Sequence, residues 1–252
     1  MSARAVTVWF IDTDDPIGFL RSDLTTDVTT AQQMANTIYG DRTLVPIRDT
    51  DLATAAAAQD PHVYVGAYGA MAVVSCSLFA TTTPSTLTRT IRSLRETAAA
   101  TLLFTDPDDS VGAFARWENG VLKRSFAADP VHIVEDEGLP YPFERPFWAG
   151  EHPLRYAPGV PPDPMALPFH PQHIAEQANR EWLGFRFTHP LADTDRDPAQ
   201  LPVTAFAIRP ADYVAGDEDW ARYQEGTSET DAPTPDVAPS KRRNPVARYF
   251  GF

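Results

Sequence analysis

The sequence predicts an α+β protein in which two or three helices pack on a mixed, largely antiparallel sheet. Runs of β-branched and aromatic residues recur along the chain, and Asn119-Gly120 stands between two of them. Other segments carry apolar residues at helical spacing. We expect one domain over residues 1–210, followed by a tail over residues 211–252.

Short apolar runs mark the strands. The first is AVTVWFI at residues 5–11, which ends at an Asp-rich turn before Pro16. Further strands are expected at residues 43–47, 63–68, 71–79, 102–104, 131–134 and 202–208.

Three helices are expected, each with a terminal signal. Asp27 or a neighbouring threonine caps the first. Thr83 and Pro84 begin the second. The third covers about residues 171–183 and ends at Gly184.

The pair Asn119-Gly120 predicts a hairpin within residues 113–126, because both residues tolerate the positive φ of a type I′ turn. Alternation predicts that its polar side chains face solvent. In the alternative, a recognition surface borders the turn, made by Trp117, Glu118, Lys123 and Arg124.

Proline is concentrated in one segment, since eleven of the 24 prolines fall between Pro130 and Pro171. That density excludes helix interiors and central strands. The segment also holds aromatic residues that a solvated linker would not need. We expect an ordered, extended segment, with candidate contacts to a binding partner at Phe147, Trp148, Glu151 and His152.

Residues 211–239 hold eight acidic residues against Arg222, with few aliphatic ones. Such a segment buries too little apolar surface to offset its chain entropy. We therefore expect an acidic, disordered tail that ends in a basic and aromatic terminus. Its charged and aromatic residues are Lys241, Arg242, Arg243, Arg248, Tyr249, Phe250 and Phe252.

Charge and cysteine content narrow the function classes. Thirty-four acidic residues against 21 basic ones give a net charge of −13, which disfavours nucleic acid and anionic membranes as partners. The single cysteine, Cys76, and the absence of an apolar run of about 20 residues predict a soluble, cytoplasmic protein. No phosphate-binding glycine motif is present, so no cofactor is predicted.

Asp12 and Asp14 follow the first strand and resemble the first motif of haloacid-dehalogenase-like phosphatases. In that family the first aspartate attacks phosphorus and the second acts as acid and base beside Mg²⁺. The sequence departs from the motif at Asp15, and no lysine-bearing motif accompanies it. Carboxylates after a strand also commonly form turns and helix caps.

A second polar group surrounds the third helix. Glu151 and His152 precede it, and His173 and Glu176 share one of its faces three residues apart. His170 lies just before Pro171. Because no HExxH or Cys/His framework supports a metal site, none is predicted, and His170, His173 and Glu176 remain weak metal candidates.

Several motifs together resemble an uncharacterised family of actinobacterial proteins, a domain of unknown function. The likeness covers about residues 3–210 and rests on FARWENG at 114–120, EG at 137–138, PFE at 142–144, FWAGEHP at 147–153, LPFHP at 167–171 and WLGF at 182–185. The resemblance implies a bacterial cytosolic setting and no mechanism.

We expect a non-catalytic, intracellular binding or protein-interaction module, because no complete catalytic constellation is visible. A protein partner and the oligomeric state are left open. The alternative is a metal-dependent hydrolase or phosphatase that uses Asp12 and Asp14, or a group made of Glu151, His152, His170 and His173.

Overall fold

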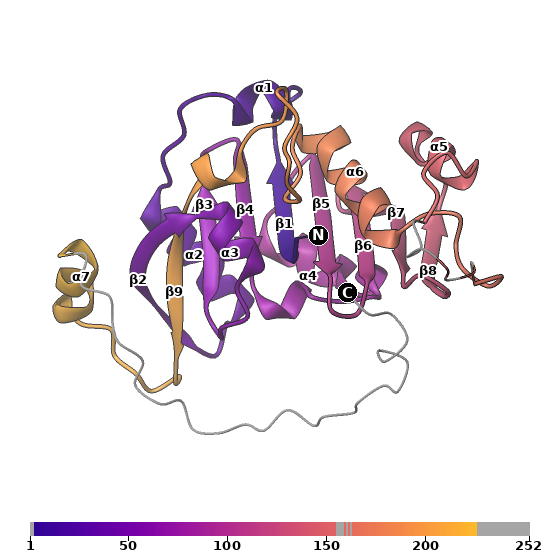
Figure 1. Cartoon of the computed structure of the whole chain (residues 1–252). Helices are drawn as coiled ribbons and strands as arrows, with labels where there is room; N and C mark the ends of the chain where they lie inside the picture. Colours follow the sequence, from indigo (N-terminus) through magenta and orange to yellow (C-terminus); the bar gives the residue numbers. More distant parts are fainter. Residues whose placement is uncertain (1–2, 155–158, 160, 162, 226–252) are drawn as a thin grey trace.

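The computed structural model describes residues 3–154, 159, 161 and 163–225 (Figure 1). Its nine strands form one sheet in the order β2-β9-β3-β4-β1-β5-β6-β7-β8. The α+β class is confirmed, although the sheet expected to be mixed pairs all its described neighbours antiparallel. The strands are β1 (Ala5–Ile11), β2 (Thr43–Asp51), β3 (Val63–Ala67), β4 (Met71–Ser75), β5 (Ala99–Asp106), β6 (Val111–Glu118), β7 (Val121–Ala128), β8 (Ile133–Gly138) and β9 (Pro202–Arg209).

Helices cover both faces of this sheet. The α-helices are α1 (Pro16–Leu20), α2 (Val28–Ile38), α3 (Leu52–Ala57), α4 (Thr88–Leu94), α5 (Arg145–Trp148), α6 (Pro171–Leu183) and α7 (Asp217–Gln224). Short 3-10 helices are η1 (Ser77–Phe79), η2 (Pro84–Leu87), η3 (Pro142–Glu144) and η4 (Pro198–Gln200).

Two apolar clusters lie on opposite faces of the sheet. Helices α1, α3 and α6 pack into one cluster, which contains Trp9 of β1. Helices α2 and α4 pack into the other, which contains Phe10. Because successive residues of a strand point to opposite faces, the unbroken apolar run of β1 places side chains in both clusters.

The expected signals at Asp27, Gly184 and Asn119-Gly120 are confirmed, whereas Thr83 makes no side-chain capping bond and is followed by the 3-10 helix η2, so that α4 begins only at Thr88. Asp27 accepts hydrogen bonds from the backbone N–H groups of Thr29 and Thr30 at the start of α2. Gly184 ends α6 with a φ of 78°. The hairpin turn between β6 and β7 has positive φ at Asn119 (49°) and Gly120 (70°), as a type I′ turn requires.

The described part of the proline-rich segment (residues 130–171) is held against β7 by a buried ion pair. The Arg124 side chain is fully buried, with its guanidinium beside the rings of Phe114 and Phe126. Its Nε and Nη2 donate to the Glu144 carboxylate at 3.0 and 2.8 Å, and Nη1 donates to Asp136. The prediction that the hairpin's polar residues face solvent is therefore wrong for Arg124, because Glu144 compensates the buried charge.

Aromatic packing completes the attachment of this segment. Phe147 and Phe169 are buried in the same cluster as α6, and Trp148 meets Phe169 edge to face at 4.9 Å between ring centroids. Short helices interrupt the segment at η3 and α5, where the sequence predicted extended chain. Residues 155–158, 160 and 162 lie outside the described part.

The C-terminal part differs from the prediction of a disordered tail from residue 211 onward. Helix α7 contacts β2, and the Tyr223 hydroxyl donates to Asp49 at 2.8 Å. Asp219 accepts from the Gly216 N–H, the Tyr213 hydroxyl and Arg222. The acidic residues of this stretch therefore have hydrogen-bond and ion-pair partners, which amino-acid composition alone does not reveal. Residues 226–252, the rest of the predicted tail, lie outside the described part.

A search of the described helices finds none long and apolar enough to span a membrane.

We expect Gly112→Ala to destabilise the protein. Helix α6 begins directly over β6, so a β-carbon at position 112 would lie 2.2 Å from the Pro171 carbonyl oxygen. Overpacking of this kind costs about 1–3 kcal/mol. Urea unfolding measures the loss. Gly40→Ala is the matched control, because a β-carbon there meets nothing within 4 Å. Equal stabilities of the two variants would contradict the close approach.

Candidate functional site

A pocket of about 540 Å³ opens where β1 ends, beside the end of α4 and the β6–β7 turn. Its volume lies within the range of small-molecule sites. Both polar and apolar side chains line it, namely Asp12, Ile91, Arg92, Arg95, Glu96, Thr97, Ala98, Ala100, Trp117, Asn119 and Gly120.

Asp12 joins three segments of the pocket wall. Its Oδ1 accepts from the Ala98 N–H at 2.8 Å, and its Oδ2 accepts from Arg95 Nη2 at 3.1 Å. The same Arg95 nitrogen donates to the Gly69 carbonyl at 2.8 Å. Each Asp12 carboxylate oxygen is therefore already engaged by a donor from the chain.

Arg92 differs from Arg95 in having no polar partner within the described part of the chain. Among the described residues, no hydrogen bond or ion pair engages its guanidinium, and the side chain is exposed. Its stem lies across Gly120, where a β-carbon would sit 2.9 Å from the Arg92 Cγ. Glycine at position 120 thus serves the turn and also makes room for Arg92.

Glu96 and Trp117 also line the pocket, one as a carboxylate and the other as a buried aromatic ring. Glu96 is exposed and has no partner among the described residues. Trp117 is fully buried, and its indole N–H donates to the Thr88 hydroxyl at 3.0 Å. Trp117 therefore anchors the hairpin to α4, which carries Arg92.

The two aspartates of the phosphatase-like motif are placed differently. Asp12 lines the pocket, whereas Asp14 is exposed and is not among the lining residues. Asp15, which departs from that motif, caps α1 by accepting from the Gly18 N–H at 2.8 Å.

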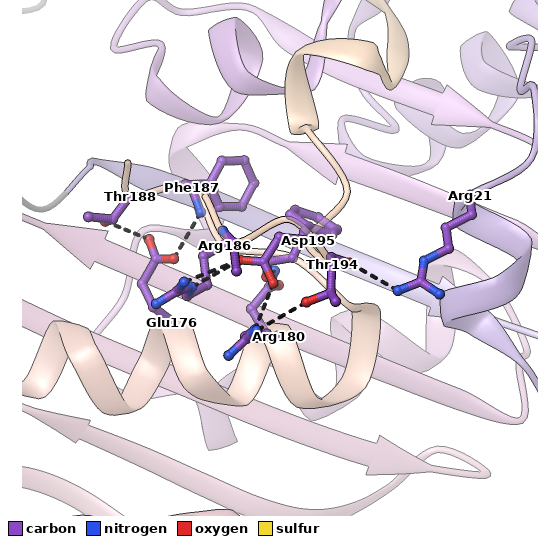
Figure 2. Close-up of polar contacts among 11 residues, drawn as sticks. Arg21, Glu176, Arg180, Arg186, Phe187, Thr188, Thr194 and Asp195 are labelled. Carbon is purple, nitrogen blue, oxygen red and sulfur yellow. Dashed lines mark hydrogen bonds and ion pairs between the residues drawn. The ribbon is translucent and has the colours of Figure 1, made fainter. Parts of the chain in front are cut away.

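The predicted metal candidates come together only in part. The His170 and His173 rings lie 5.2 Å apart between centroids. Glu176 is buried and turns to a different segment, where it accepts from the Phe187 N–H at 2.8 Å and from the Thr188 hydroxyl at 3.1 Å (Figure 2). Within the described residues, no group of three or more His, Cys, Asp or Glu side chains could hold a metal ion.

His170 has a structural role at the start of α6. Its Nδ1 accepts from the Gln172 N–H at 3.3 Å, which caps the helix. Burial, together with the charge of His173, lowers the pKa of His170 to about 4. The imidazole therefore stays neutral at physiological pH, as an acceptor must.

The other predicted residues lie away from the pocket, Trp117 excepted. Phe147 is buried, and the exposed His152 stacks on it at 4.3 Å between ring centroids. Glu151 is exposed. Glu118 pairs with Arg116 on the hairpin, and Trp148 is partly exposed.

A second polar cluster joins α6 to the segment that follows it (Figure 2). The Asp195 side chain is 1% exposed and pairs with Arg180 Nε at 2.7 Å and Arg186 Nη2 at 3.2 Å. Burial opposes ionisation of Asp195, but the hydrogen bonds from the Ala192 N–H and Arg180 lower its pKa overall. Because Arg180 and Arg186 both pair with Asp195, we interpret this cluster as structural.

Sequence reasoning missed Arg92, Arg95 and Glu96. A usable signal was the spacing of Arg89, Arg92 and Arg95, which concentrates positive charge along one helix and at the residue that follows it, in an acidic chain. Spacing alone does not reveal which of these arginines is already paired.

The chain belongs to a family of unknown function, DUF6928, whose match covers residues 5–206. No curated protein and no solved structure matches the chain. The match confirms the resemblance to an uncharacterised domain of unknown function, whereas the actinobacterial origin stays a prediction and the activity has to be inferred from the site.

We expect His170→Asn to flatten the dependence of stability on pH between about 6.5 and 4. The folded-state pKa of His170 is depressed to about 4, so in this range the unfolded chain binds a proton that the folded chain does not. Stability from this residue is complete above the unfolded pKa and is lost as pH falls. Asparagine keeps the cap without titrating.

Urea midpoints at pH 7.5, 6.0 and 5.0 measure the effect. His189→Asn, at an exposed side chain without a hydrogen bond or ion pair among the described residues, should keep the wild-type slope. A wild-type slope in His170→Asn would contradict the assignment of this titration to His170.

Proposed function

We propose that the protein is a non-catalytic binding protein that takes a small organic anion into the pocket at Asp12, Arg92 and Trp117. The observation that carries the proposal is the free guanidinium of Arg92 at the wall of a 540 Å³ pocket. A guanidinium binds carboxylates and phosphates through two parallel hydrogen bonds.

The chain holds Arg92 ready for such a ligand. Trp117 fixes the hairpin to α4 through Thr88, and Gly120 leaves a surface on which the Arg92 stem rests. Because the Arg92 side chain is held in place before the ligand binds, less conformational entropy is lost on binding. Ile91 and Ala100 supply apolar lining beside the charged groups, which suits an organic anion better than a bare inorganic ion.

Glu96 sets a preference among anions. It lies two residues beyond the end of α4 at Leu94 and lines the same pocket as Arg92, with no ion pair to it among the described contacts. Its carboxylate repels additional negative charge on a ligand in the pocket. A ligand with one or two negative groups is therefore favoured over a highly charged one.

Binding is favoured over hydrolysis by the state of Asp12. Asp12 is held by the Ala98 N–H and by Arg95 as part of the pocket wall, and Asp14, the carboxylate that would act as acid and base, does not line the pocket. The phosphatase alternative keeps one supporting observation, since Asp12 lines the pocket. Mg²⁺-dependent hydrolysis of p-nitrophenyl phosphate that disappears in Asp12→Asn would establish that alternative and overturn ours.

The setting that we propose is the cytoplasm of an actinobacterium. The family resemblance and the single cysteine support it. A partner protein that exchanges the ligand fits this setting.

We expect Arg92→Ala to weaken anion binding at least tenfold. A hydrogen bond to a charged group contributes about 1.5–3 kcal/mol, or roughly 10- to 150-fold in affinity. Thermal shifts with acetate, succinate, citrate and phenyl phosphate identify the best anion, and calorimetry then gives its Kd for each variant. Glu96→Gln should tighten binding, because it removes a negative charge from the pocket wall.

Arg89→Ala is the matched control. Arg89 is an exposed arginine of the same helix that does not line the pocket, so its removal should leave the Kd unchanged. No thermal shift with any of the four anions, or equal losses in Arg89→Ala and Arg92→Ala, would contradict the proposal.

A further inference from the structure

Strand β8 forms an open edge of the sheet. It pairs with β7 on one side, and no strand of the described chain lies on its other side. Backbone N–H and C=O groups along such an edge are free to pair with another extended segment. Figure 1 shows β8 at one end of the sheet and α7 beside β2 at the other.

Apolar side chains are exposed along this edge. Ile133, Val134 and Leu139 are 42%, 49% and 86% exposed. Soluble proteins usually protect an edge strand with charges, prolines or a covering segment. We refer to residues 133–139 as the β8 edge.

The β8 edge is also acidic, and this charge limits what can cover it. Glu137 is exposed and its side chain has no partner among the described residues. Antiparallel pairing of two β8 strands about their midpoint would set Glu135 against Asp136 of the second copy. Like charges directly opposite each other are destabilising, so a second β8 is a poor partner and a basic strand is a good one.

We propose that the β8 edge is covered by the basic and aromatic terminus of the same chain, residues 241–252. Arg248, Phe250 and Phe252 alternate along the sequence, so in a strand they would share one face. An antiparallel register that sets Arg248 against Glu137 also sets Phe252 against Ile133. Arg248 then meets an opposite charge and Phe252 meets an exposed aliphatic side chain, while Phe250 lies opposite Glu135, whose carboxylate is already bound by Ser85 and Ser125.

The length of the chain permits this contact. The described chain ends at residue 225, just after α7 at the β2 edge. Eight strand spacings of about 4.8 Å separate β2 from β8, or about 38 Å. Residues 226–240 extend to about 50 Å at 3.3 Å per residue. The proposal is independent of the pocket and its ligand.

Amide hydrogen exchange on the full-length protein tests the proposal by a charge swap. Glu137→Arg and Arg248→Glu should each speed exchange in residues 133–139 at least tenfold at low salt. The double variant should restore wild-type protection, because it reverses the same pair. Asp109→Arg alters an exposed acidic residue elsewhere and should leave this exchange unchanged.

The other occupants give different results. Equal exchange in the wild type and all three variants would overturn the proposal and leave the edge open for a separate protein. Protection that increases with protein concentration would show that a second copy covers the edge, which also contradicts pairing within one chain. Protection that is independent of concentration and restored by the charge swap supports the proposal.

Discussion

The buried charge of Arg124 is the constraint on which the end of the sheet depends. A guanidinium without exposed surface must find acidic partners, because an uncompensated buried charge costs several kcal/mol. Glu144 supplies a bidentate partner from a segment 20 residues further along the chain, and Asp136 supplies another from β8. Strand β7 can therefore be buried only if the proline-rich segment folds onto it.

Strand β7 also connects the Arg124 ion pair to the candidate site. Strand β7 begins next to Gly120, and Gly120 and Trp117 line the pocket that contains Arg92. Near its turn, the hairpin is thus fixed on β7 by Arg124 and on β6 by the bond from Trp117 to Thr88. A rigid hairpin explains how a turn at the surface can hold the stem of a free arginine in one place.

Local sequence signals predicted most of the helices, strands and turns. The roles of individual side chains depend instead on partners that are distant in the sequence. Asp27, Gly184 and Asn119-Gly120 act through neighbours in the sequence, so their caps and turn were predictable. Arg124 was expected in solvent, because its partner lies far along the chain. Of the site, only Asp12 and Trp117 were anticipated, since pairing by Arg95 and freedom of Arg92 depend on tertiary contacts.

A double-mutant cycle between Arg124 and Glu144 tests most directly whether this ion pair holds the proline-rich segment. Arg124→Met should lower the free energy of unfolding by about 3–5 kcal/mol in urea, because the buried Glu144 loses its cationic partner, and Glu144→Gln should lower it by less, because Arg124 keeps Asp136. The double variant should recover much of the loss, with a coupling of at least about 2 kcal/mol. Losses that simply add, to within about 0.5 kcal/mol, would contradict the central role of the pair.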